Sequence, residues 1–225
     1  MAAPLAGGHR GVSFDTLAPH YRWMELLLAG GALQECRTRF LGELDRSREV
    51  LVLGPGRGGF TRALLTRWPD VRVTLLDSSR GMLGRVRRDL RSAGLSTDRV
   101  TLVHDDVQRW APPTPCFDAV ATHFFLDCFE PTELRALVAR VARWTTPRAC
   151  WLVSDFRVPD GGWRRRRAQA IHALMYAFFR ATTHISANRL TPPDVLLGDA
   201  GFRLDRRVVS NFGLLHTDLW VRGIR

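Results

Sequence analysis

The chain has 225 residues, of which 45% are hydrophobic, and this length and composition fit one α/β domain with a sizeable core. It has no run of about 18 or more apolar residues, and its N-terminus lacks a charged segment followed by an apolar stretch, so neither a membrane span nor a secretory signal is expected. The sequence therefore predicts a single-domain cytoplasmic protein.

The formal charge of +11 would ordinarily suggest a nucleic-acid partner. However, all 33 basic residues are arginine and none is lysine, which indicates a compositional bias rather than selection of one binding surface. Arg164 to Arg167 form a true local cluster. We interpret it as a solvated face, with an acidic substrate, a membrane surface and RNA as open alternatives.

Residues 1–13 are small and glycine-containing, and we expect them to be flexible. Residues 14–45 space their apolar side chains for helices, broken at Gly30-Gly31, and predict a helical cap. Strand and helix patterns then alternate, which predicts a mostly parallel sheet with helices on both faces. The predicted strands are 49–53, 71–76, 99–103, 117–122 and 149–155, and the predicted helices are 60–68, 80–92 and 131–145.

After Asp155 the alternation ends, and residues 157–200 predict a helical insertion that would cover a substrate. Its main helix, residues 163–182, has a wide apolar face made by Ala170, Ile171, Leu174, Met175, Ala177, Phe178 and Phe179. A short helix near 193–199 follows. Two last strands, at about 203–210 and 213–222, predict an antiparallel pair at the edge of the sheet.

The most informative stretch is Glu-Val-Leu-Val-Leu-Gly-Pro-Gly-Arg-Gly-Gly-Phe-Thr at 49–61, where a buried strand ends in glycines before a helix. Gly54, Gly56 and Gly58 lack the β-carbon that would block a ligand, and the helix N-terminus can meet a polar group. Asp77 ends the second strand 23 residues after Gly54, close to the roughly 20-residue interval at which a carboxylate accepts hydrogen bonds from a ribose. The alternatives are that the glycines serve only a tight turn and that Asp77 only caps a helix.

A nucleotide-like cofactor is the leading inference from the glycine loop, and three further segments indicate which class of protein would bind it. They are Asp77-Ser-Ser-Arg-Gly-Met-Leu, then Val-Thr-Leu-Val-His-Asp-Asp-Val ending at 107, then Phe117-Asp-Ala-Val-Ala-Thr-His. With the glycine loop, they resemble the class I S-adenosylmethionine-dependent methyltransferases over about residues 14–160. The resemblance implies a Rossmann-like sheet of seven strands with S-adenosylmethionine at its carboxyl edge.

The resemblance also implies roles for particular residues. Asp106 would accept the adenine amino group and the Val107 amide would donate to the ring, while Ser78 and Met82 belong to the cofactor-binding segment after Asp77. The family usually has an acid where this chain has Val52, so the methionine ammonium would rely on backbone carbonyls near Gly54 and Thr122. The resemblance places Tyr21 at the methionine end; packing in the core is the alternative.

The segment Thr122-His-Phe-Phe-Leu-Asp follows the fourth strand, where the substrates of this family meet the methyl group. If it begins a helical turn, its four-residue spacing puts His123 and Asp127 on one face. We predict His123 as a general base and Asp127 as the group that orients it. The alternative is that His123 only packs near the cofactor and Asp127 caps a helix.

Three more residues are predicted to contact the substrate. Asp155 ends the fifth strand, while His172 and Tyr176 lie on the predicted cover. The alternative for Asp155 is a carboxylate paired with an arginine. The alternative for His172 and Tyr176 is that they are ordinary half-buried side chains of a helix. No His and acid set has metal-ligand spacing, and the dispersed cysteines form no Cys-x-x-Cys pair, so no metal is expected.

The leading hypothesis is a methyltransferase that acts on an O, N or S atom of a small, partly hydrophobic molecule. One alternative is an NAD(P)-type oxidoreductase, because Gly54, Gly56 and Gly59 also fit Gly-x-Gly-x-x-Gly. Another is an RNA-binding or RNA-methylating module. Thr122-His-Phe-Phe does not match the Pro-Pro motif of adenine-amino methyltransferases, so a nucleic-acid partner is not the expected one.

Overall fold

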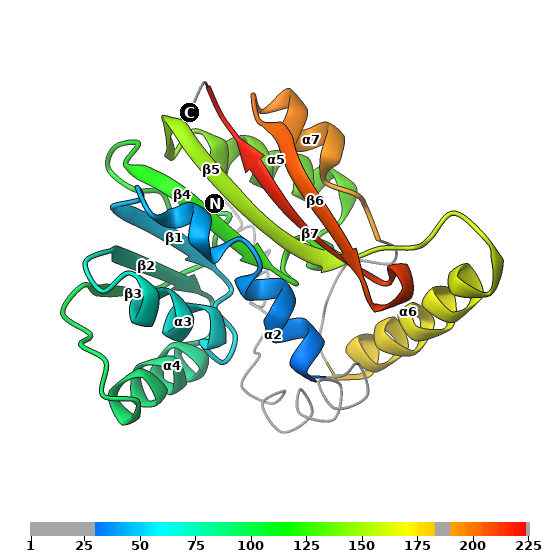
Figure 1. Ribbon diagram of the computed structural model, residues 1–225, viewed down its shortest axis with the longest axis horizontal. Helices are drawn as coiled ribbons and strands as arrows, with labels where there is room; N and C mark the ends of the chain where they lie inside the picture. Colours follow the sequence, from blue (N-terminus) through cyan, green and yellow to red (C-terminus); the bar gives the residue numbers. More distant parts are fainter. Residues whose placement is uncertain (1–29, 183–189, 224–225) are drawn as a thin grey trace, which may run out of the picture.

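A computed structural model describes residues 30–182 and 190–223, and at its centre is a seven-stranded sheet. The strands are β1 (Glu49–Leu53), β2 (Arg72–Asp77), β3 (Val100–His104), β4 (Phe117–His123), β5 (Thr145–Phe156), β6 (Arg203–Ser210) and β7 (Leu215–Val221). Their order is β3-β2-β1-β4-β5-β7-β6 (Figure 1). β7 runs antiparallel to both of its neighbours, and the other pairs are parallel. The predicted fold class is confirmed.

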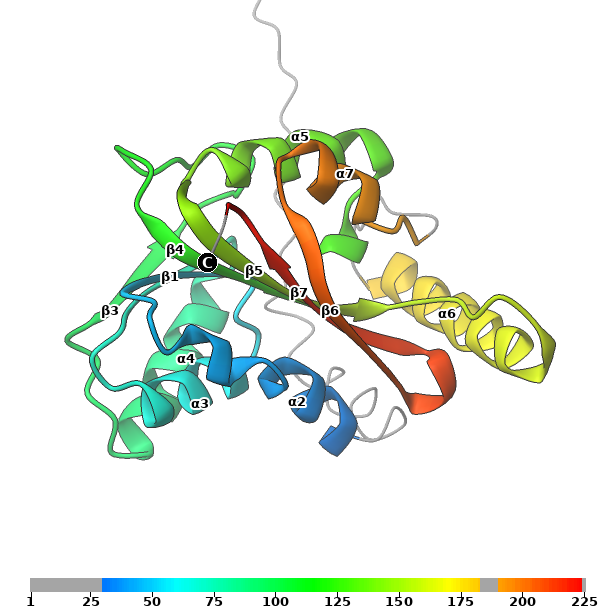
Figure 2. The ribbon, with the colours of Figure 1, turned by 45° about the horizontal axis from the view of Figure 1, so that its top comes forward.

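Helices cover both faces of the sheet. One face carries α2 (Gly30–Thr38), α3 (Gly59–Arg67) and α4 (Arg80–Ser92), and the other carries α5 (Pro131–Ala142) and α7 (Asp194–Asp199), as Figure 2 shows. Side chains of β1 alternate between the two cores: Val50 and Val52 pack towards α3 and α4, whereas Leu51 and Leu53 pack towards α5. β1 is therefore buried on both of its faces, between the two cores.

α6 (Gly162–Thr182) stands apart from these layers, at one end of the molecule (Figure 1). A third apolar cluster attaches it, in which Ala168 and Met175 pack with Phe156 at the end of β5 and with Leu215 of β7. The predicted apolar face is only partly correct, because Ala170, Leu174 and Ala177 are exposed. Among the described residues the helix therefore buries one stripe and leaves the stripe of Ala170, Leu174 and Ala177 exposed.

Three element boundaries differ from the prediction by two residues or more. α5 ends at Ala142 and β5 begins at Thr145, four residues before the predicted strand, because Thr145 pairs with Phe117 across a register shift in β4. β7 begins at Leu215 rather than 213, because Asn211–Gly213 form the short 3₁₀ turn η4. The other predicted strands lie within one residue of those observed.

Candidate cofactor and acceptor site

The three segments predicted to hold the cofactor lie at one edge of the sheet. They follow the carboxyl ends of β1, β2 and β3, which are neighbours in the sheet. Backbone hydrogen bonds join them: the Gly54 amide donates to the Leu76 carbonyl at 3.0 Å, and the Asp105 amide donates to the Asp77 carbonyl at 3.3 Å. Ligands of open α/β sheets bind at this edge.

The glycine loop is built on left-handed backbone, with φ of 60° at Gly54, 53° at Gly56 and 76° at Gly58. A β-carbon on Gly54 would lie 2.5 Å from Cδ2 of Phe125, and one on Gly58 would lie 2.9 Å from Cγ1 of Val86. A β-carbon on Gly56 would meet nothing within 4 Å. Gly54 and Gly58 therefore make room for protein side chains, Gly56 faces open space, and the contact of the three glycines with a ligand stays a prediction.

Asp77 organises the start of α4. Its Oδ1 accepts from the Ser79 amide at 2.8 Å, and Ser79 Oγ accepts from the Met82 amide at 3.1 Å, which makes Ser79 the N-cap. Ser78 is exposed, and its carbonyl lies 3.0 Å from Nε2 of His104. The cap of α4 is thus Ser79, while the Asp77 carboxylate closes the turn before it, and the contact of Asp77 with a ribose stays a prediction.

Asp106 and Val107 form a turn after β3. Asp106 Oδ1 accepts from the Gln108 amide at 2.8 Å, and the Asp106 amide donates to Asp105 Oδ1 at 2.7 Å. The Val107 side chain is buried in the core shared with α5. These contacts fix the turn, while its contact with adenine stays a prediction.

His123 ends β4 with its side chain on the α2 and α3 face. Its ring packs edge-on against Phe60, with the ring centroids 4.6 Å apart, and its Nδ1 lies 3.0 Å from Ser154 Oγ. Register explains the partner, because His123 pairs with Ser154 of β5 and paired residues face the same side. Ser154 was not predicted as a partner of His123, although Ser-Asp at the end of the neighbouring strand was a usable signal.

The hydrogen bonds of Ser154 indicate which imidazole nitrogen carries the proton. Ser154 Oγ donates to the Cys36 carbonyl at 3.1 Å, so it accepts from Nδ1–H of His123. Nε2 then holds a lone pair, and this atom is buried without a hydrogen-bond partner in the described part of the chain. Burial, aided by the charge of Arg37, lowers the pKa of His123 to about 3, so its ring is neutral at pH 7.

Phe124 continues this wall in a strained conformation. It has a φ of 56°, which is unusual for a residue with a bulky side chain, and its amide donates to the Ser154 carbonyl at 2.7 Å. Its ring centroid lies 5.1 Å from that of Phe156 and 5.2 Å from Cζ of Arg37. The backbone at the end of β4 is thus held by its neighbours in a shape it would not adopt alone.

A cavity of about 470 Å³ lies between the glycine loop and this wall. The predicted residues Gly54, Gly56, Gly58 and His123 line it. Gln34 and Arg37 of α2, Phe60 of α3 and Phe124 also line it and were not predicted. Asp77 and Asp106 are not among the lining residues, although they lie at the same edge of the sheet.

Asp127 does not orient His123, contrary to the prediction. It hydrogen-bonds with Asp155, whose strand position places it with Trp151 and Val153 on the α5 face, opposite Ser154 and His123. Burial is the main cause that raises the pKa of Asp127 to about 6 and holds the pKa of Asp155 well above its usual range. The two carboxyls therefore share a proton near neutral pH.

Replacing Asp127 with asparagine should make stability less dependent on pH. The folded pKa of Asp127 is raised from 3.8 to about 6, so its stabilising contribution is complete below about pH 4 and is lost as pH rises through 6. The asparagine amide cannot ionise, so D127N should gain on the wild type between pH 4 and 7. Urea unfolding at both pH values measures this, and a constant difference would contradict the shared proton.

The remaining predicted residues have different outcomes. Thr122 is fully buried and its Oγ1 accepts from Nε1 of Trp151 at 2.9 Å, so its side chain is committed to the core. His172 is buried against Phe156, with ring centroids 5.8 Å apart, and its Nε2 has no partner in the described part of the chain. Tyr21 and the side chain of Tyr176 lie outside the described residues.

Residues 50–148 match the sequence family described as "Methyltransferase domain". The match, the strand order and the glycine loop identify this region as part of a class I S-adenosylmethionine-dependent methyltransferase domain. Within the described ranges, no helix is long and apolar enough to cross a membrane, and no group of three or more His, Cys, Asp or Glu residues could hold a metal ion.

Individual proteins are similar to this chain over different shares of its length. A trans-aconitate 2-methyltransferase from an Azoarcus species is 39% identical over 72 residues, which are 32% of this chain and 26% of that protein. The matched region thus spans about a quarter of the relative's length. A Burkholderia thailandensis 1,6-didemethyltoxoflavin-N1-methyltransferase, solved with 1,6-didemethyltoxoflavin and S-adenosylhomocysteine, has a TM-score of 0.65 at 20% identity, covering 99% of this chain and 92% of its own.

The same fold recurs in a putative O-methyltransferase from Nostoc punctiforme. Its TM-score is 0.72 at 15% identity, over 98% of this chain and 64% of the other. At such low identity the likeness concerns the fold, and the strand order above belongs to that fold.

Proposed function

We propose that this chain transfers the methyl group of S-adenosylmethionine to an O, N or S atom of a small, partly hydrophobic acceptor. The observation that carries the proposal is the cavity between the glycine loop and the wall formed by His123 and Phe124, inside a methyltransferase domain. Relatives named as acting on small molecules support this substrate class.

The residues present fit the cofactor. Gly56 leaves open space beside backbone amides at the start of α3, and Asp77 and Asp106 provide carboxylates at the adjoining strand ends. S-adenosylmethionine supplies an electrophilic methyl group on a positively charged sulfur, so the protein's main task is alignment and exclusion of water. We assign Gly54, Gly56 and Gly58, together with Asp77, Ser78, Met82, Asp106, Val107 and the Thr122 carbonyl, to binding it.

We assign His123 to the acceptor. Nε2 is the unprotonated atom, it is buried beside the cavity, and the Nδ1 contact with Ser154 fixes the plane of the ring. It can accept the hydrogen of an acceptor O–H or N–H and hold the lone pair of that group in line for transfer. Asp155, His172 and Tyr176 are proposed as more distant acceptor contacts, with α6 as the cover.

Calorimetry and product analysis test the function. The protein should bind S-adenosylhomocysteine and not NAD, and it should transfer label from S-adenosylmethionine to a small molecule in a cell extract, identified by mass spectrometry. Binding of NAD instead would favour the oxidoreductase alternative. Label in RNA, or salt-dependent RNA binding without transfer, would favour the nucleic-acid alternative.

Replacing His123 with leucine should lower kcat by about 100-fold or more while leaving the affinity for S-adenosylhomocysteine within about twofold. His123→Gln, whose amide oxygen can still accept a hydrogen bond, should recover part of the rate. Because the pKa of His123 is about 3, the wild-type rate should show no loss from this group between pH 8 and 5. A fully active leucine variant would remove His123 from the mechanism.

A further inference from the structure

Apolar side chains gather at one end of the molecule, away from the cavity. Of the five large hydrophobic side chains that stand exposed in the described part, four lie on α6, at the end of β6 or on the turn between β6 and β7. They are Trp163 (59% exposed), Leu174 (58%), Val209 (45%) and Phe212 (61%). The rings of Trp163 and Phe212 are 5.7 Å apart, so residues distant in sequence form one surface.

The exposed stripe of α6 extends this surface. Trp163, Ala170, Leu174 and Ala177 recur at the spacing of one helix face, and all four are exposed. The opposite stripe, with Ala168 and Met175, is buried against the end of β5. α6 is thus apolar on both sides, and only one side is covered by the described residues.

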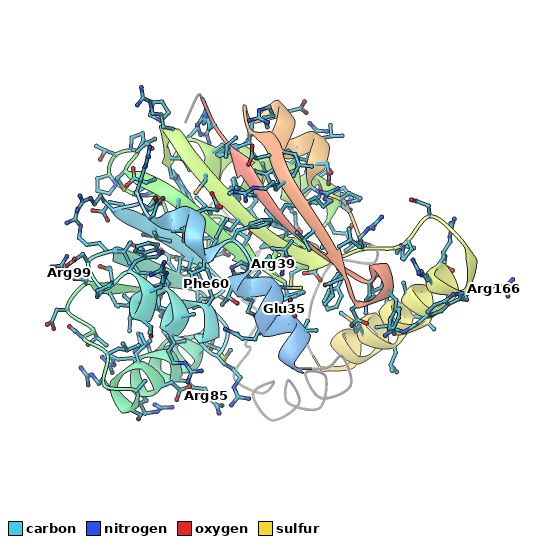
Figure 3. The ribbon with its side chains drawn as sticks, viewed as in Figure 1. Glu35, Arg39, Phe60, Arg85, Arg99 and Arg166 are labelled. Atoms are coloured by element: carbon cyan, nitrogen blue, oxygen red, sulfur yellow. The ribbon has the colours of Figure 1, made fainter. Side chains whose placement is uncertain are left out.

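Positive charge adjoins the start of the apolar stripe, where Arg164 and Arg166 flank Trp163 on the helix and Arg165 lies near the opposite side. Arg164, Arg165 and Arg166 are exposed in the first turns of α6, and no ion pair links them to an acid among the described residues. Arg166 extends away from the body of the molecule (Figure 3). A helix N-terminus is itself positive, so neighbouring cations there are unfavourable until an anion neutralises them. The positive charge of this surface therefore favours an anionic partner.

The turn between β6 and β7, which presents the exposed ring of Phe212, has a strained backbone. Asn211 and Phe212 both have positive φ, 48° and 55°, which costs free energy in residues other than glycine. Arg167 donates to the Asn211 carbonyl and to its Oδ1, and its guanidinium lies 5.5 Å from the Phe212 ring. A hollow of about 420 Å³, lined in part by Arg157, Arg164 and Phe212, opens beside this turn.

We propose that this end surface, made by Trp163–Arg167, Leu174, Val209 and Phe212, docks on an anionic lipid membrane and lies in its interface without crossing it. A helix with arginines beside Trp and Leu is the pattern that binds such an interface, the apolar side chains entering the headgroup boundary while the cations meet lipid phosphates. Soluble RNA would leave Leu174 and Val209 in water. A symmetric second copy would bring the two arginine clusters together.

Vesicle sedimentation with the full-length protein tests the proposal, comparing phosphatidylcholine vesicles with vesicles that also contain phosphatidylglycerol. Binding should require phosphatidylglycerol and weaken at high salt. R164Q/R166Q, which changes the two exposed arginines that flank Trp163, should lower the partition coefficient about 30-fold, which corresponds to about 1 kcal/mol per arginine. The matched control is R87Q/R88Q, two exposed neighbouring arginines on α4, which should bind like the wild type.

The apolar part is tested separately. Trp163→Ser with Leu174→Ser should abolish the blue shift of tryptophan emission on vesicles, and thermal unfolding should confirm that the variants remain folded because both positions are exposed. The proposal is overturned by absence of binding at low salt, by equal loss in the α4 control, by tighter binding of an RNA oligonucleotide to the same arginines, or by self-association that depends on Leu174. It does not depend on the methyl-transfer activity.

Discussion

Truncating Asp218 to alanine is expected to destabilise the fold by about 3 to 5 kcal/mol, the range for removing one partner of a buried ion pair. Asp218 is fully buried in β7, and its two oxygens accept from Nε and Nη2 of Arg207 at 2.7 and 2.6 Å. His216 Nδ1 and Trp220 Nε1 approach the same carboxylate at 3.0 and 3.3 Å. In the variant, His216 and Trp220 lose this acceptor inside the sheet, while Arg207 keeps only Asp194, whose Oδ1 lies 2.8 Å from its Nη2.

The pH dependence of the wild type should report the same network. Burial alone would raise the pKa of Asp218, but the hydrogen bonds from Arg207 and His216 outweigh burial and hold its pKa below the usual range. The contribution to stability is therefore present above the unfolded pKa and lost as pH falls through the folded one. In D218A, this acid-range loss of stability should be absent.

Two variants make the Asp218 prediction specific. Asp70→Ala removes the partner of Arg99 in an ion pair whose side chains are 82% and 50% exposed, and it should cost no more than about 1 kcal/mol. Replacing Arg207 with Met and Asp218 with Leu together should restore much of the stability, because no unpaired charge remains buried. Guanidinium unfolding measures all three, and equal losses in D70A and D218A would contradict the account.

Local pattern was enough to predict most of the sheet. β1 to β4 are short runs rich in β-branched and apolar residues that end at Leu53, Asp77, His104 and His123, and the runs with the residues that follow them indicate both the strands and their ends. The neighbour of β5 was less accessible. That β7 lies between β5 and β6 is settled by pairing over distant sequence, which short-range pattern does not encode.

In the site, too, local segments could be predicted from the sequence, whereas contacts between distant segments could not. The cofactor segments could be predicted because each is a strand end followed by distinctive residues. The pairing of His123 with Asp127 failed because a four-residue spacing brings side chains together only on a helix. Here β4 extends through His123, Phe124 has positive φ, and the chain leads Asp127 to the opposite face beside Asp155. Ser154 and Arg37 come from other elements and could be placed only by the tertiary structure.

Two alanine variants of the glycine loop should separate folding from binding. Gly54 and Gly56 both have positive φ, so alanine should cost roughly 1 to 2 kcal/mol of backbone strain at either position. At Gly54 the new methyl also collides with the Phe125 ring, 2.5 Å from Cδ2, whereas at Gly56 it enters open space. We therefore expect G54A to be the less stable protein.

The affinity for S-adenosylhomocysteine should show the opposite order: relative to the stability that each variant loses, G56A should lose more affinity than G54A. In G56A the new methyl occupies space beside the cavity, so the affinity for S-adenosylhomocysteine should fall by about tenfold or more, equivalent to about 1.4 kcal/mol, while the protein stays folded. In the G54A background, Phe125→Ala should recover stability, because it removes the ring that the methyl meets. Calorimetry and thermal unfolding on the same samples measure both effects. If G56A bound the cofactor product like the wild type, the open face of the loop would not be where the cofactor lies, and the cavity would need another ligand.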